Sequence, residues 1–116
     1  MPKNSSDRLR AICLALPEAE EVVLRRGPTY RVGDKIFALD RRHEGGAALW
    51  YKVPSGSQAI LIGADPARFF SPPYYGTKGW IGIRLDAKTD WKEVTRLIRR
   101  SFCLIAPKRL AALAQG

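Results

Sequence analysis

The fold is set by residues Gly27–Ala38, whose sequence is GPTYRVGDKIFA. Aromatic and β-branched residues, which favour strands, lie on both sides of the pair Gly33-Asp34. A glycine–aspartate pair is a common two-residue turn between antiparallel strands. The stretch therefore predicts a β-hairpin whose turn is flanked by Val32 and Lys35.

The neighbouring segments extend this hairpin into an antiparallel meander. Strand-forming residues recur in EEVVLRRG before it and in ALWYKV after it, and Gly27-Pro28 and Gly45-Gly46 punctuate the segments. A later strand is expected in WIGIRL, from Trp80 to Leu85.

One helix is expected ahead of the strands. Apolar residues recur with helical spacing from Leu9 to Leu16, which predicts a helix over about Ser6–Leu16 with Ser5 or Ser6 as its cap. The following proline ends it.

Further helices are expected between and after the strands. Ser55 and Gln58 have capping-box spacing, which predicts a short helix over about Ser57–Gly63. Asp65-Pro66 predicts another helical turn, which carries Phe69-Phe70.

The last long helix is predicted to begin at the capping pair Asp90 and Glu93 and to run to about Ala106. Pro107 breaks it, and KRLAALAQ adds a weaker helical turn or two. The order of elements indicates a single α+β domain over residues 1–116.

The loop Ser71–Trp80, SPPYYGTKGW, joins the middle of the chain to this last strand. Gly76 or Gly79 is expected to have a positive φ, and the two tyrosine rings are expected to cap the sheet edge. Lys78, a cation at a loop tip beside aromatic rings, is a candidate phosphate contact.

Side-chain alternation places Trp50 with Lys52, and Trp80 with Arg84, on shared faces of their strands. If these faces point away from the helices, the open side of the sheet carries tryptophans between cations. The alternative is that the tryptophans belong to the core, as large aromatic residues usually do.

The net charge of +9, with a pI near 10.1, draws polyanions such as nucleic acid to the protein. Two segments, Arg25–Lys52 and Lys92–Arg109, account for this charge, with +4 and +5 respectively.

The cations of the last long helix share one side of it. At about 100° per residue they lie opposite the apolar residues. These candidate phosphate contacts are Lys92, Arg96, Arg99 and Arg100. Arg41 and Arg42 in the turn DRRHEGG would add a basic hairpin tip. A merely solvated basic face is the alternative.

The sequence contains no pattern typical of a catalytic or metal centre. His43 is the single histidine, Cys13 and Cys103 lack a CxxC spacing, and no phosphate-binding glycine loop occurs. We therefore expect no enzyme activity, no metal and no cofactor. We also expect Cys13 to be buried and Cys103 to be half-exposed near Arg99 and Arg100.

No apolar segment approaches the roughly 20 residues that span a membrane, and no signal sequence is visible. A cytoplasmic location without membrane attachment is expected.

Four stretches together resemble the MmcQ/YjbR family: LALPEAEE, GPTYRVGDKIFA, DPARFF and YYGTKGWIGIRL. The resemblance implies a CyaY-like α+β fold, in which helices pack on one face of a bent antiparallel sheet. Members are usually described as proposed DNA-binding proteins, and the family supplies no catalytic residues to carry over.

The hypothesis is therefore a protein that binds nucleic acid, DNA first, through weak and salt-sensitive phosphate contacts. The alternative is a protein-interaction module that uses an open sheet face with exposed Trp50 and Trp80, since tryptophan and arginine are enriched at binding hot spots.

Overall fold

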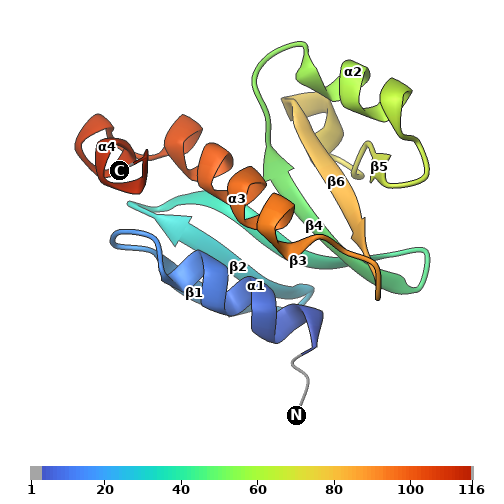
Figure 1. The fold of residues 1–116 in the computed structure, drawn as a ribbon. Helices are drawn as coiled ribbons and strands as arrows, with labels where there is room; N and C mark the ends of the chain where they lie inside the picture. The colour runs from blue at the N-terminus through green and yellow to red at the C-terminus, as the bar shows by residue number, and fades with distance from the viewer. Residues whose placement is uncertain (1–3, 116) are drawn as a thin grey trace.

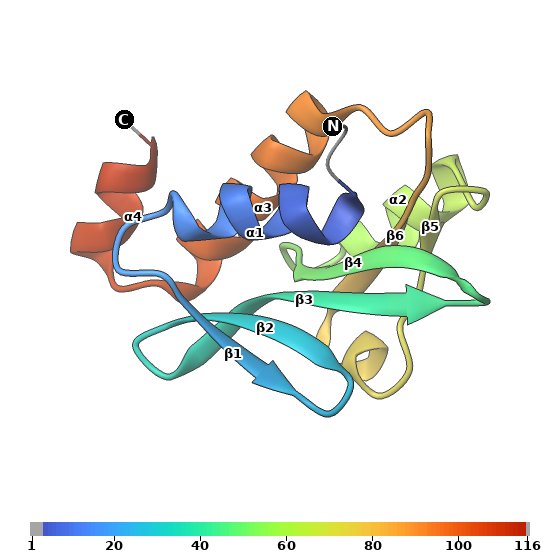
Figure 2. The ribbon, with the colours of Figure 1, turned by 90° about the horizontal axis from the view of Figure 1, so that it is seen from below.

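The computed structural model describes residues 4–115, and in this part of the chain an antiparallel six-stranded sheet has the order β1-β2-β3-β4-β6-β5. The elements are α1 (Ser5–Leu14), β1 (Glu20–Leu24), β2 (Gly27–Val32), β3 (Lys35–His43), β4 (Gly46–Lys52), α2 (Ser57–Ala64), β5 (Phe69–Phe70), the 3-10 helix η1 (Tyr75–Lys78), β6 (Trp80–Leu85), α3 (Trp91–Ile105) and α4 (Lys108–Gln115). Figures 1 and 2 show α1, α3 and α4 on the same side of the sheet. The predicted α+β class is confirmed.

The predicted hairpin is confirmed. Val32 pairs with Lys35, and Gly33 and Asp34 between them have φ values of 54° and 71°. Both central positions of a type I′ turn require positive φ, which explains the glycine–aspartate pair. In the preceding connection Gly27 begins β2 and pairs with Leu24, so the turn is Arg25-Arg26, two residues earlier than the expected Gly27-Pro28.

A β-bulge in β3 gives the sheet its local bend. Tyr30 pairs with Ala38 and Arg31 with Ile36, which leaves Phe37 without a partner in β2. The extra residue turns both Phe37 and Ala38 toward the helices, whereas Ile36 packs against the opposite face.

The two longer helices follow the predicted patterns with shifted ends. The cap of α1 is Asn4, whose side chain accepts from the Asp7 amide at 2.8 Å, rather than Ser5 or Ser6. The side chain of Asp90 caps α3 by accepting from two backbone amides, as expected.

Two predictions around α2 are wrong. The N-cap of α2 is Gly56, and the Gln58 side chain donates instead to the Gly76 and Trp80 carbonyl oxygens at 3.0 and 2.6 Å. Phe69-Phe70 is a short strand rather than a helical turn, because it pairs with β6 and is buried there.

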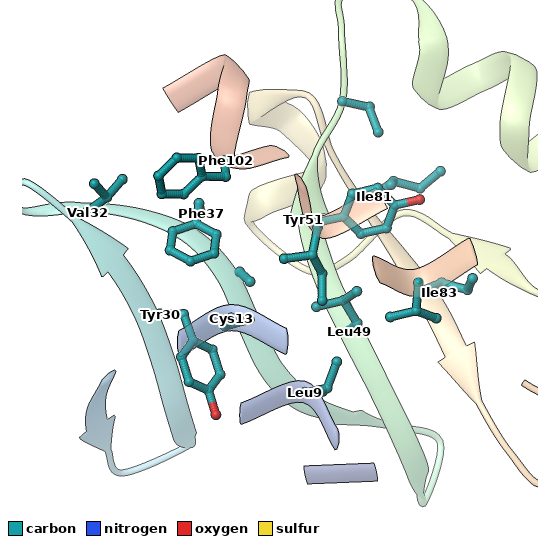
Figure 3. Packing of buried hydrophobic residues seen from close by; sticks show 14 of the residues in the cluster. Leu9, Cys13, Tyr30, Val32, Phe37, Leu49, Tyr51, Ile81, Ile83 and Phe102 are labelled. Carbon is teal, nitrogen blue, oxygen red and sulfur yellow. The ribbon is translucent and has the colours of Figure 1, made fainter. Parts of the chain in front are cut away.

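The main core lies between the sheet and the helices. Leu9 and Cys13 of α1 face Tyr30, Leu49 and other residues of the strands, as Figure 3 shows. Phe102 of α3 meets the bulged Phe37 edge to face, with ring centroids 5.2 Å apart. These contacts fix α3 across the sheet and determine which of its sides stays in solvent.

A second apolar cluster occupies the opposite face of the sheet, and it corrects one prediction. Trp50 and Trp80 do point away from the helices, but only 6% and 7% of their surface is exposed. The ring of Tyr75 in η1 covers them, with centroid distances of 6.0 and 5.2 Å, and Phe70 packs beside them. Figure 2 shows η1, the short gold coil, on the side of the strands away from the helices.

The loop Ser71–Trp80 thus covers the tryptophans through η1. Of its two candidate glycines, Gly79 has a positive φ, at 84°, and Gly76 does not. Gly79 allows the chain to leave η1 and enter β6 without strain.

Candidate nucleic-acid interface

The exposed side of α3 carries the predicted cations. Its buried residues are Val94, Ile98, Ser101 and Phe102, which pack toward the sheet. The opposite side exposes four cations, here called the α3 basic face: Lys92, Arg96, Arg99 and Arg100. The helix lies on the outside of the molecule in Figure 1, so this face is open to a large partner.

No acidic side chain neutralises this face within residues 4–115. Glu93 is the single acid of α3, and its two carboxylate oxygens accept from Arg68 at 2.6 and 3.3 Å. Arg68 also pairs with Asp65 at 2.8 Å. None of the four cations takes part in an ion pair in the described part of the chain. They are spaced to repel one another, which costs stability unless an anion is bound.

The structure does not bring the other predicted phosphate contacts to this face. Arg41 is half-buried, and its Nη1 donates to the carbonyl oxygens of Pro28 and Asp40 at 3.2 and 3.0 Å, so it holds β2 against β3. Burial lowers the pKa of Arg41. Arg42 is exposed. Lys78 lies on η1, across the sheet from α3, and donates to the Tyr74 hydroxyl at 2.7 Å.

The alternative interaction face is not an exposed aromatic surface. Its two tryptophans are buried, and both cations are used to hold loops. Lys52 Nζ donates to the Lys78 carbonyl at 2.7 Å, and Arg84 donates to the carbonyl oxygens of Pro66 and Ala67. The hypothesis of exposed tryptophan anchors is therefore wrong, because η1 and β5 cover them.

A hollow that the sequence did not indicate adjoins the α3 basic face. It has a volume of about 490 Å³. Its walls are Pro54, Arg96, Arg99, Arg100, Cys103 and Leu104. A second, narrower hollow of about 190 Å³ lies between α2 and α3 and shares Pro54 and Arg100 with the first. The helical spacing of the arginines predicted one wall, but the approach of α2 is a tertiary feature.

The two thiols occupy different environments, as expected. Cys13 is fully buried, and desolvation, with the nearby charges of Asp40 and Glu21, raises its pKa. Cys103 is half-buried in the wall of the larger hollow, and its Sγ lies 3.6 Å from the Ala111 carbonyl oxygen.

Cys103 is expected to react much faster than Cys13 with a thiol reagent such as Ellman's reagent, because only thiolates that the reagent reaches are attacked. A Cys103→Ser variant should lose the fast phase and retain the slow one. Equal, slow reaction of both thiols would contradict this expectation.

A buried carboxyl group lies under α1. The Oδ2 atom of Asp40 has no hydrogen-bond partner in the described part of the chain, and burial raises the pKa of Asp40. A hydrogen bond to Ser6 and the charges of Arg41 and Arg42 offset this only in part.

The pKa of Asp40 is higher in the folded state than its unfolded-state value of about 4. Asp40 therefore contributes most to the free energy of unfolding below pH ~4, and this contribution is lost as the pH rises through the folded-state pKa. Asp40→Asn should therefore raise the free energy of unfolding at pH 7 by about 1 kcal/mol and give no gain at pH 4. Urea unfolding of both proteins at pH 4, 5.5 and 7 tests this. A variant that is equally destabilised at every pH would contradict it.

Two kinds of site are absent from the described residues: a metal-binding cluster and a membrane-spanning helix. No group of three or more histidine, cysteine, aspartate or glutamate side chains is placed to hold a metal ion in residues 4–115. Within the same residues, no helix has the length and apolar character needed to cross a membrane.

These features define a small α+β protein in which helices cover one face of an antiparallel sheet and one helix presents an unpaired basic side. The model of the YjbR family matches residues 14–104, and the chain belongs to this family. The resemblance seen in the sequence is thereby confirmed.

A solved structure supports the same fold. The crystal structure of the Deinococcus radiodurans protein DR2400, described as a DUF419 domain, is similar to this chain with a TM-score of 0.78. The two are 22% identical, and the match covers 99% of this chain and 91% of that chain. No curated protein matches the chain. Neither the YjbR family nor the DR2400 protein is named for an enzymatic activity, and the absence of catalysis stays a prediction.

Proposed function

We propose that this protein binds nucleic acid through the phosphate backbone, with the α3 basic face as its contact surface. The observation that carries the proposal is the set of four exposed cations, which form no ion pair within residues 4–115 because Glu93 is bound by Arg68. Arginine is suited to phosphate because its planar guanidinium donates two parallel hydrogen bonds.

The proposed binding is electrostatic. Phosphate contacts position a protein on nucleic acid without reading its sequence, and they release counterions from the backbone. Three or four such contacts give an affinity that falls by roughly 40- to 150-fold between 0.05 and 0.2 M salt. Binding is therefore expected to be weak at physiological salt and nearly indifferent to base sequence.

The test is a fluorescence anisotropy titration of the protein against labelled duplex and single-stranded oligonucleotides over this salt range. A linear fall of log K with log salt, with a slope of about −3, is the expected result. Failure to bind either strand form at 0.05 M salt would refute the proposal, and so would binding that salt does not weaken.

A further inference from the structure

The hollow between α2 and α3 continues the surface of the α3 basic face. It shares Pro54 and Arg100 with the arginine-lined hollow, so the two hollows adjoin, and together they are here called the α2–α3 groove. The inner part of the groove is bounded by Tyr51, Lys52, Val53, Pro54, Ser57, Ile60, Leu61, Leu97 and Arg100. One end is thus rich in arginine, and the other is mostly apolar.

Each end of the groove exposes an apolar side chain that gains from being covered. Ile60 on α2 is 72% exposed, and Leu104 on α3, beside the arginines, is 48% exposed. Burial of apolar surface contributes about 25 cal/mol per Å². The polar side chains at the inner end are few, chiefly those of Ser57 and Arg100.

The two ends of the groove fit a ligand with two parts: an anion for the arginine-rich end and a compact ring with apolar faces for the other end. Arg100 borders both parts, so an anion held there places its attached group in the apolar part. A volume of about 190 Å³ accommodates one ring system but lies below the ~300 Å³ at which pockets for drug-sized ligands begin. A nucleotide has this construction: a phosphate, and a flat base with apolar faces and polar edges.

We propose that the α2–α3 groove accepts one unstacked base of single-stranded nucleic acid while Arg96, Arg99 and Arg100 hold the adjoining phosphates. The inference rests on the proposed function and narrows its substrate class. A duplex keeps its bases stacked and paired, so it reaches the arginines but cannot fill the groove without the cost of extruding a base.

Three probes of equal length, measured at 0.05 M KCl, separate the base contact from the phosphate contact: a mixed-sequence single strand, an abasic strand of deoxyribose phosphates, and the duplex. The base-bearing strand is expected to bind about tenfold more tightly than the abasic strand, since the apolar faces of the base leave water when it enters the groove. It should also bind more tightly than the duplex, although charge density alone favours the duplex.

A neutral change in the groove wall tests the same contact from the protein side. Ile60→Gln should weaken binding of the base-bearing strand by about fivefold, because it removes apolar surface that the base would cover, and leave the abasic strand and the duplex unchanged. Leu113→Gln is the matched control, because Leu113 is 66% exposed on α4, outside the groove. Circular dichroism melting of both variants checks that they fold.

Equal affinity for the base-bearing and abasic strands would overturn the groove proposal while leaving phosphate binding intact. An unchanged affinity of Ile60→Gln for the base-bearing strand would do the same. A poly-glutamate peptide that binds as tightly as the single strand would also overturn it, in favour of an acidic protein partner. Absence of binding to all three nucleic acid probes would instead refute the proposed function itself.

Discussion

The double variant Arg96→Gln/Arg99→Gln is expected to bind duplex DNA about a hundredfold more weakly than the wild type at 0.05 M salt. Each lost phosphate contact removes about 0.9 from the slope of log K against log salt, so the slope should become less steep by about 2. The loss should be equal for different sequences, because phosphates carry no base information.

The matched control changes the same charge elsewhere. Arg25 and Arg26 are exposed in the turn between β1 and β2, and neither takes part in an ion pair in the described residues. Figure 2 shows this turn on the side of the strands away from α3. Arg25→Gln/Arg26→Gln should therefore weaken binding only slightly. Equal losses in the two double variants would mean that overall charge, rather than the α3 basic face, drives association.

Both double variants should retain their stability. Exposed side chains away from caps and cores usually change the free energy of unfolding by less than about 0.5 kcal/mol. Arg96 lies three and four residues from Arg99 and Arg100, so its neutralisation even relieves repulsion. A binding loss accompanied by a lower melting temperature would point to misfolding instead.

The parts of this fold that the sequence predicts are those with local causes. The turn Gly33-Asp34 follows from the φ values that a two-residue hairpin demands. The α3 basic face follows from helical spacing alone, because the side that packs on the sheet must be apolar. Both features can be seen in a window of a few residues.

The parts of the fold that the sequence does not predict depend on contacts between segments that are distant along the chain. Phe69-Phe70 is too short to show alternation, and it becomes a strand only because β6 lies beside it. Alternation places Trp50 and Trp80 on shared faces of their strands but leaves open which side those faces take, and their burial depends on where η1 folds. The α2–α3 groove was missed for the same reason, since no pattern within α2 states which helix it approaches.

Ser101 is a further residue whose role only the tertiary structure shows. It lies on the buried side of α3, and its hydroxyl donates to the Phe37 carbonyl oxygen at 2.6 Å and accepts from the Lys52 amide at 2.9 Å. Pairing of β3 with β4 reaches Ala38 and Tyr51 and stops there. The hydroxyl thus bridges Phe37 of β3 and Lys52 of β4, the next residues beyond the end of that ladder, and it ties α3 to both strands.

Ser101→Ala is expected to lower the free energy of unfolding by about 2–4 kcal/mol. The change leaves a donor and an acceptor of the backbone unpaired between the sheet and α3, and each unsatisfied buried group costs about 1–3 kcal/mol. Urea unfolding at pH 7 measures the loss.

Thr95→Ala is the matched control, because the Thr95 hydroxyl donates only to the Trp91 carbonyl oxygen one turn earlier in the same helix, at 2.8 Å. That carbonyl oxygen also accepts a backbone hydrogen bond within α3, so it keeps a partner when the hydroxyl is removed. The loss in the free energy of unfolding should therefore stay below about 0.5 kcal/mol. If Ser101→Ala costs no more than Thr95→Ala, water satisfies the Phe37 carbonyl and the Lys52 amide, and α3 is held on the sheet by apolar packing alone. If it costs the expected amount, this hydroxyl adds to the apolar contacts that hold α3 on the sheet, and so to the direction in which Arg96, Arg99 and Arg100 face the solvent.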